Sequence, residues 1–299
     1  MKDAALTPAG DCLRIDLLRA TFATDGVVLL RAVLNRRSMK WARRAFEWSI
    51  QHPGPGAGLV LAGKAGAFYQ DHANPAAFDA YRLLLQDTGL ADLIADLMDS
   101  ERLWLLYEQI WFKHGAALPT PWHQDLPYVP MAGDDLATAW LSLDPIDQAY
   151  SLEFVAGSHR GPLYNPTAFD PIDPKATMFA PDVWPPLPDI ETRRTAFPIV
   201  SFAIVPGDIV VFHPAILHGG APTPPGGRRR TISLRFFGDR AYCAQRPEAG
   251  LYEADKLTTG NAPRDPMVAM ARQPNGTLFR HPAFPYLRGP GHASSTIAS

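Results

Sequence analysis

Apolar residues recur at helical spacing in the first third of the chain. Between Ser38 and Gln51 they fall three and four residues apart, as on one face of a helix, and Ser38 is placed to cap its N-terminus. Leu13–Thr24 is a shorter amphipathic segment, and Asp87–Met98 repeats the longer pattern. These segments predict that residues 1–100 form a mostly helical cover.

The pattern changes at Leu103 to short runs of β-branched and aromatic residues, which are separated by turn residues. Short strands in succession, with no helices alternating between them, predict a β-sandwich or barrel over residues 103–240. The predicted strands are Val27–Leu30, Leu103–Phe112, Pro121–Leu126, Thr138–Leu143, Leu152–Val155, Ile199–Ala203, Ile209–Phe212 and Thr231–Phe237.

Two stretches interrupt or follow this pattern. Residues 165–198 form a Pro-rich insertion between strands, and a loop of this length inside a compact domain is usually functional or disordered. Residues 250–299 are rich in Pro and Gly and are expected to be irregular. With no linker and no internal repeat, residues 1–299 are predicted to be one domain.

Composition excludes several classes of partner. The chain carries 28 basic and 30 acidic residues, so nothing favours nucleic acid or an anionic membrane surface, and a small molecule is the expected ligand. Cys12 and Cys243 form no CxxC or paired spacing, which favours free thiols and a reducing cytosol. The sequence shows no signal peptide and no apolar run of membrane-spanning length, and it predicts a soluble cytoplasmic protein. The oligomeric state is not readable.

The pattern His-x-Asp occurs at His123-Gln124-Asp125 on a predicted strand, where alternate residues point to the same face. A third ligand must come from a later strand, and both His213 and His218 follow one. Two histidines and one carboxylate form a facial triad that leaves three metal positions open, which suits non-haem iron(II) better than structural zinc. A lone His-x-Asp is a weak signal of metal binding, so the interpretation depends on the motifs around it.

Several motifs together resemble the phytanoyl-CoA dioxygenase family, in the order and spacing expected over about Leu17 to Gly238. The motifs are Asp25–Arg31, Pro121–Tyr128, Phe154–Gly161, Gly207–Gly219 and Arg229–Ser233. The resemblance implies a double-stranded β-helix core of the jelly-roll or cupin-like type, mainly β with a helical cover. It also implies Fe(II), 2-oxoglutarate and O2 as cofactor and cosubstrates, with succinate and CO2 as coproducts.

The same resemblance ranks the candidate residues. It favours His218 over His213 as the third ligand, because His218 precedes a Gly-Gly pair that allows close approach. Two departures separate the chain from the family. The Asn-Gly pair often found before the Gly-Ser-His turn is replaced by residues 150–153, and Gly220 lacks a hydroxyl sometimes found there. The resemblance therefore does not extend to the substrate.

Arg229 is the residue expected to bind the distal carboxylate of 2-oxoglutarate. On a strand it shares a polar face with Thr231, Ser233 and Arg235, and these neighbours could add contacts. The opposite face, from Arg230 to Phe236, is apolar and fits packing under helices.

Four further residues are predicted to contact the cofactor or line the pocket. Tyr107 and Gln109 share one face of the preceding strand with Trp111, and Trp140 lies near the cosubstrate in the family. These aromatic residues indicate a substrate with an apolar or aromatic part.

The expected function is an oxygenase that hydroxylates a small organic molecule, and desaturation, cyclisation and epoxidation share the same iron site. The alternatives are a non-catalytic ligand-binding β-helix protein and a zinc-dependent hydrolase, although no motif supplies the general base that a hydrolase needs. Halogenases related to the family lack the carboxylate that Asp125 supplies, so halogenation is not expected.

Overall fold

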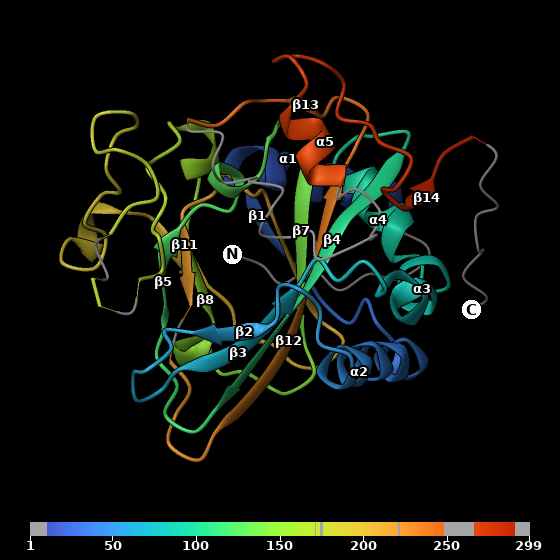
Figure 1. Ribbon diagram of the computed structural model, residues 1–299. Coiled ribbons are helices and arrows are strands. Elements are labelled where there is room, and N and C mark those ends of the chain that lie inside the picture. The colour runs from blue at the N-terminus through green and yellow to red at the C-terminus, as the bar shows by residue number, and fades with distance from the viewer. Residues whose placement is uncertain (1–10, 171, 174–175, 221, 248–265, 291–299) are drawn as a thin grey trace.

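The computed structural model describes residues 11–170, 172–173, 176–220, 222–247 and 266–290 (Figure 1). The helices are α1 (Asp11–Asp25), α2 (Arg36–Gln51), α3 (Phe78–Gln86), α4 (Leu90–Leu97) and α5 (Pro266–Ala271). The first seven strands are β1 (Val27–Leu30), β2 (Gly58–Val60), β3 (Phe68–His72), β4 (Leu103–His114), β5 (Thr120–His123), β6 (Met131–Ala132) and β7 (Leu136–Ser142). The others are β8 (Leu152–Val155), β9 (Ile199–Ser201), β10 (Ile209–Phe212), β11 (His218–Gly220), β12 (Arg228–Phe237), β13 (Tyr242–Cys243) and β14 (Tyr286–Arg288).

Two antiparallel sheets form the β core. The large sheet has the order β1-β10-β7-β12-β4-β3-β2, with β14 also paired to β4, and the small sheet has the order β5-β11-β8-β9. The small sheet lies on one side of the large sheet and helices α2, α3 and α4 lie on the other (Figure 1). The prediction of a mainly β protein with a helical cover is confirmed.

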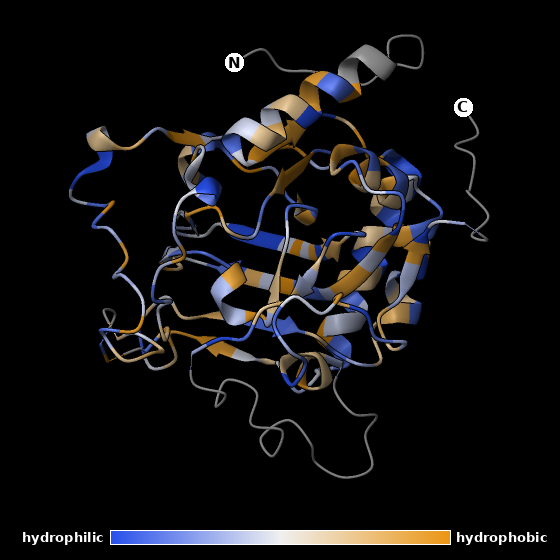
Figure 2. Cartoon of the chain, turned by 90° about the horizontal axis from the view of Figure 1, so that it is seen from above, coloured by the Kyte–Doolittle hydropathy of each residue, from blue (hydrophilic) through white to orange (hydrophobic). Residues whose placement is uncertain are grey.

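The alternation of side chains along β12 connects the two faces of the large sheet. Ile232, Leu234 and Phe236 pack in the core shared with helices α2, α3 and α4, while Thr231 and Ser233 face the opposite side. Strands near the centre of Figure 2 accordingly change between hydrophobic and hydrophilic along their length. The polar and apolar faces predicted for this strand are therefore confirmed, because residues two apart on a strand share a face.

The N-terminus of α2 differs from the prediction. Asn35, and not Ser38, caps the helix, because the Asn35 side chain accepts hydrogen bonds from the backbone N–H groups of Arg37 and Ser38. Ser38 lies in the first turn and is buried. Both residue types cap helices, and apolar periodicity alone does not choose between two caps three residues apart.

Short strands at sheet edges were not anticipated. Strands β2 and β3 lie within the segment predicted to be mostly helical, and β3 pairs with β4. Helix α5 and strand β14 lie within the segment predicted to be irregular, of which residues 250–265 and 291–299 fall outside the described residues. These strands are only three to five residues long, so pairing creates them rather than local pattern: β3 and β14 pair with β4, and β2 pairs with β3.

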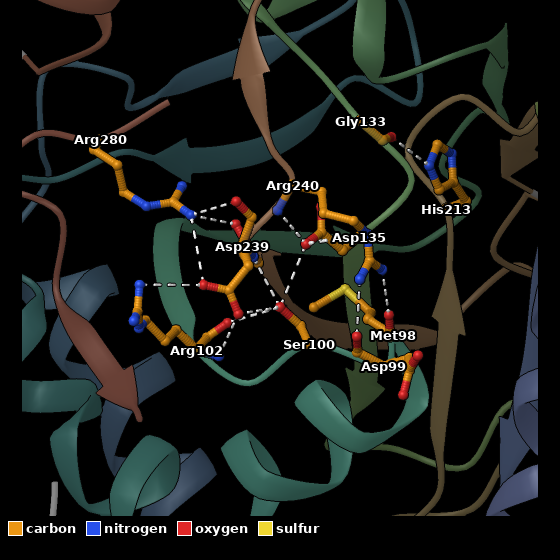
Figure 3. Close-up of polar contacts among 11 residues, drawn as sticks. Met98, Asp99, Ser100, Arg102, Gly133, Asp135, His213, Asp239, Arg240 and Arg280 are labelled. Carbon is orange, nitrogen blue, oxygen red and sulfur yellow. Dashed lines mark hydrogen bonds and ion pairs between the residues drawn. The ribbon is translucent and has the colours of Figure 1, made fainter. Parts of the chain in front are cut away.

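A charged network fixes the end of β12 beyond the core (Figure 3). Asp239 accepts a hydrogen bond from the backbone of Arg102, and the buried Asp135 accepts one from the backbone of Arg240. Ser100 lies between the two carboxylates and contacts both. The network joins the turn after β12 to the start of β4, and this anchors the central strand pair. Among the described residues, no helix combines the length and apolar character needed to cross a membrane.

Candidate metal centre

His123 and Asp125 reach the same point by different local structures. His123 is the last residue of β5, whereas Asp125 lies after the strand with φ −73° and ψ −34°, at the start of the 3-10 helix Leu126–Tyr128. The prediction that both residues lie on one strand is therefore wrong. The chain turns directly after His123, and that turn brings the Asp125 Oδ1 atom to 3.5 Å from His123 Nε2.

His218 joins them from the neighbouring strand. It is the first residue of β11 and lies directly opposite His123 in the β11–β5 pair, with the two ring centroids 4.2 Å apart. Its Nε2 atom is 3.9 Å from Asp125 Oδ1. One ligand atom from each of the three residues lies within 4.8 Å of the others, and all three residues are buried. No other cluster of this kind is found in the described part of the chain.

Both imidazoles are oriented by a backbone carbonyl. His123 Nδ1 is 2.8 Å from the carbonyl oxygen of Pro121, and His218 Nδ1 is 3.0 Å from that of Ile216. A proton on each Nδ1 satisfies these bonds and leaves the Nε2 lone pair for a metal, as in most histidine metal sites. Burial, and then the proximity of His123, lowers the pKa of His218 to about 3, so its imidazole is neutral at physiological pH. A neutral imidazole is the form that binds metal.

His213 lies outside this cluster, although it is only five residues from His218. Its Nδ1 accepts a hydrogen bond from the backbone of Ala215, and its Nε2 faces the carbonyl oxygen of Gly133 at 3.3 Å (Figure 3). Its ring packs beside Phe22. Burial lowers the pKa of His213 to about 4, with a smaller effect of His159 in the same direction.

The second carboxylate oxygen of Asp125 is bound by Arg235. Oδ2 accepts hydrogen bonds from Arg235 Nη2 at 2.9 Å and from Nε at 3.2 Å. Burial alone raises the pKa of Asp125, but Arg235 and the two histidines together lower it well below its usual range. The carboxylate is therefore ionised, and its Oδ1 atom faces the histidines.

A cavity that is partly open to solvent is lined by the three candidate ligands. The sequence-predicted residues Arg229, Thr231, Ser233 and Trp140 all line it. Trp111 and Arg235, which the sequence placed on the same faces as these candidates, line it as well, and Lys113, Thr120, Leu152 and Phe212 line it without having been predicted. The signal for Lys113 was present in the sequence, because it continues the alternate-residue face of β4 that carries Trp111.

Gln109 and Tyr107 share that face of β4 but do not line the cavity. The Gln109 amide instead donates to the side-chain oxygen of Gln70 at 2.9 Å, and the Tyr107 ring lies 4.8 Å beneath the guanidinium carbon of Arg235. Tyr107 therefore supports an Arg235 side chain that reaches Asp125.

Two buried basic side chains lie side by side in the lining of the cavity. Arg229 is opposite Lys113 in the β12–β4 pair, and their side chains are 6% and 1% exposed. Arg229 Nη1 donates to the carbonyl oxygen of Tyr150 at 2.7 Å, while its buried Nε has no hydrogen-bond partner. Lys113 Nζ donates to the backbone carbonyl oxygen of Leu118 at 2.8 Å. Among the residues that the structure describes, neither cation forms a salt bridge.

Burial lowers the pKa of both side chains. It lowers the pKa of Arg229 to about 10, and burial together with the charge of Arg229 lowers the pKa of Lys113 well below its usual value. Arg229 remains charged at physiological pH. A buried guanidinium without an acidic partner is costly, and a bound anion would offset that cost.

The Pro-rich insertion is tied to the metal-binding segment. The Gln124 side chain, between the two candidate ligands, donates to the carbonyl oxygen of Ala215 at 2.7 Å and accepts from the backbone N–H of Tyr164 at 2.9 Å. The hydroxyl of Tyr128 donates to the carbonyl oxygen of Thr167 at 2.7 Å. These bonds hold the start of the insertion beside His123.

Phe169 from the insertion reaches the candidate metal centre itself. Its ring centroid is 5.3 Å from that of His123 and 6.0 Å from that of Tyr128. The Phe169 backbone has φ +53°, in the left-handed region that is unfavourable for an aromatic residue. The strain indicates that surrounding contacts hold Phe169 in place.

The donor set fits a mononuclear iron(II) centre. Two imidazoles and one ionised carboxylate would supply three ligands to such an ion, and the cavity that they line would leave room for further ligands. The unpartnered Arg229 Nε lies in the same cavity and fits an anionic cosubstrate.

Comparison with known proteins agrees with this chemistry. The model of the phytanoyl-CoA dioxygenase family matches residues 22–231. A probable phytanoyl-CoA dioxygenase of Caenorhabditis elegans is 31% identical over 121 residues, which are 40% of this chain and 36% of that relative. Peroxisomal phytanoyl-CoA dioxygenase of Homo sapiens is 31% identical over 119 residues, 39% of this chain and 32% of the human protein. The aligned region thus spans about a third of each relative's length.

Solved structures show the same fold over most of the chain. The non-heme alpha ketoglutarate dependent epimerase SnoN from nogalamycin biosynthesis matches with a TM-score of 0.69 and 20% identity, over 95% of this chain and 99% of that protein. The carbocyclase SnoK from the same biosynthesis matches with a TM-score of 0.63 and 18% identity, over 91% and 95%. The jelly-roll core predicted from the sequence is confirmed by this likeness.

Proposed function

Because this chain belongs to the phytanoyl-CoA dioxygenase family, we propose that it is an iron(II)- and 2-oxoglutarate-dependent oxygenase that hydroxylates a small organic molecule. The observation that carries the proposal is the buried cluster of His123, Asp125 and His218, with both Nδ1 atoms tied to carbonyls and one carboxylate oxygen left for the metal. Iron bound there, with 2-oxoglutarate and O2, supplies the oxidising power to attack a C–H bond, with succinate and CO2 as coproducts.

Arg229 is proposed to bind the distal carboxylate of 2-oxoglutarate. Its guanidinium is buried, charged and without an acidic partner in the described part of the chain, and it lies in the cavity that contains the candidate metal ligands. Thr231 and Ser233 lie on the same face of β12 and can add hydroxyl contacts, while Trp140 lines the same cavity. Lys113 places a second nitrogen at that end and strengthens the preference for an anion.

The substrate is proposed to have an apolar or aromatic part. Phe169 and Tyr128 pack against His123, so a molecule that approaches the metal from this side meets two aromatic rings. A solved structure of SnoN is described as a complex with Fe3+, alpha ketoglutarate and nogalamycin RO, a small organic molecule. Because proteins of this fold are described as an epimerase and a carbocyclase, product analysis must cover outcomes besides oxygen insertion.

Two further predictions are retained as part of the proposal. The first is a cytoplasmic setting, which rests on the few cysteines, of which Cys243 is free and buried. The second is a contact of Tyr107 or Gln109 with the cofactor, which rests on their position on the cavity-facing side of β4.

Anaerobic titration tests the proposal. Fe(II) and 2-oxoglutarate together should produce a weak visible charge-transfer band, followed in air by succinate formation with the correct substrate. A zinc-dependent hydrolase gives no such band, and a non-catalytic binding protein gives no succinate with any substrate in a broad screen. Absence of the band, with metal bound, would reject the oxygenase assignment.

A further inference from the structure

Arg235 has no role in metal or cosubstrate binding in the proposal above, yet its side chain makes two hydrogen bonds to the candidate ligand Asp125. Both of its hydrogen bonds to Asp125, from Nη2 and Nε, end on the same oxygen, Oδ2. The other oxygen, Oδ1, is the one that lies 3.5 Å from His123 Nε2 and 3.9 Å from His218 Nε2.

The difference between the two oxygens matters for the chemistry. A carboxylate can bind a metal through one oxygen or through both. Two histidines and a one-oxygen carboxylate leave three positions open in an octahedral site, whereas a two-oxygen carboxylate leaves only two. Chelation of the cosubstrate takes two positions and O2 needs one more, so only one-oxygen binding leaves room for both.

We propose that Arg235 is a positioning residue that holds Oδ2 of Asp125 and thereby restricts this ligand to metal binding through Oδ1 alone. The inference rests on the proposed function, since it concerns the same metal site. It adds to that function a residue that is not itself a ligand but keeps one coordination position of the metal open.

The surroundings of Arg235 suit this task. Its side chain is 10% exposed and extends from the central strand β12, opposite Tyr107 on β4 and Thr138 on β7. The Tyr107 ring supports the guanidinium from one side at 4.8 Å. A planar guanidinium held on a central strand fixes both the position and the direction of its donors, which a flexible ammonium does not.

A purely electrostatic role makes the opposite prediction. Arg235 is a cation near a divalent metal, so its removal would strengthen metal binding if repulsion were its main effect. Removal of a positioning residue weakens metal binding, typically about 10–100-fold for a group that orients a ligand. The sign of the change therefore separates the two roles.

Binding of Co(II) and Mn(II) alone, without 2-oxoglutarate, provides the test. Arg235→Met should weaken both metals about 10–100-fold and shift the visible absorption of bound Co(II), because the carboxylate is no longer held. Arg235→Lys keeps the charge and should recover part of the affinity but not the parent spectrum. Arg230→Met is the matched control, since Arg230 lies on the opposite face of the same strand and pairs with Asp144, and it should leave affinity and spectrum unchanged.

Arg235→Leu carries the same test if Arg235→Met does not fold, because it also removes every donor to Oδ2. Circular dichroism checks the fold of each variant. Parent-like or tighter metal binding with an unchanged Co(II) spectrum in Arg235→Met or Arg235→Leu overturns the inference. Failure of the parent protein to bind either metal overturns the proposed function instead, so the two failures are distinguishable.

Discussion

Arg229 lies directly opposite Lys113 across the β12–β4 pair, and both side chains enter the cavity that contains His123, Asp125 and His218. Each cation is bonded to a backbone carbonyl, and neither forms a salt bridge among the described residues. The same cavity therefore combines the candidate metal ligands with the buried positive charge of Arg229, which an anionic cosubstrate needs.

Arg229→Ala should sharply reduce affinity for 2-oxoglutarate and leave metal binding nearly unchanged. Loss of one partner of a buried charge pair costs about 3–5 kcal/mol, which corresponds to about 10²–10⁴ in affinity. Anaerobic titration of the charge-transfer band measures both quantities. Arg228→Ala is the control, because Arg228 is exposed and its Nη2 atom forms a surface ion pair with Asp144 at 3.4 Å. Parent-like affinity in Arg229→Ala would make Lys113 the next candidate.

Replacement of the two neighbouring histidines should give opposite results. His218→Ala should abolish metal binding and 2-oxoglutarate turnover, since His218 Nε2 faces Asp125. His213→Ala should keep most of both, because His213 contacts Gly133 instead, although loss of its packing lowers the melting temperature. Metal content, measured by mass spectrometry, and succinate formation distinguish the two variants. A dead His213→Ala with an active His218→Ala would assign the third ligand to His213.

The parent protein should produce no halogenated product in chloride buffer. Asp125 occupies the metal position that a halide takes in enzymes without this carboxylate, and Arg235 holds it there. Mass spectrometry of the product, once a substrate is known, shows chlorine by its isotope pattern. A chlorinated product from the unmutated protein contradicts this expectation.

The insertion formed by residues 165–198 should become more resistant to protease when cosubstrate and substrate bind. Phe169 lies against His123 and packs beside Tyr128, so a bound ligand completes the surroundings of a strained residue. Limited proteolysis with and without ligands measures this. Phe169→Ala should lower the protection and alter the substrate KM. Equal cleavage rates with and without both ligands count against a lid.

Glu108 should make stability depend on pH. Burial, partly opposed by backbone hydrogen bonds including that from Asn74, raises the pKa of Glu108 from 4.5 to about 7. Its folded pKa lies above the unfolded value, so the associated stability is complete below pH 4.5 and is lost as pH rises through about 7. This amounts to about 3 kcal/mol.

Glu108→Gln keeps an oxygen acceptor for Asn74 and removes the charge, so it should be more stable than the parent protein at pH 8 but not at pH 4. Urea unfolding at both pH values measures the difference. Glu101→Gln, at an exposed position, is the control. A parent protein whose stability stays constant from pH 4 to 8 would show that Glu108 does not titrate in this range.

Local patterns in the sequence determined much of this protein. Alternation along β12 separated Thr231 and Ser233 from Ile232 and Leu234, because residues two apart on a strand share a face wherever the strand lies. The helical spacing of α2 was equally readable, since one face of a surface helix must be apolar to pack.

Tertiary structure decided the contacts between distant segments. The turn after β5 places the Asp125 carboxylate, the pairing of β11 with β5 selects His218 over the nearby His213, and β4 recruits β3 and β14 as neighbours. The bond between Arg235 and Asp125 joins residues 110 positions apart. No local pattern encodes such a bond, because it depends on how β12 of the large sheet faces the turn that follows β5 of the small sheet.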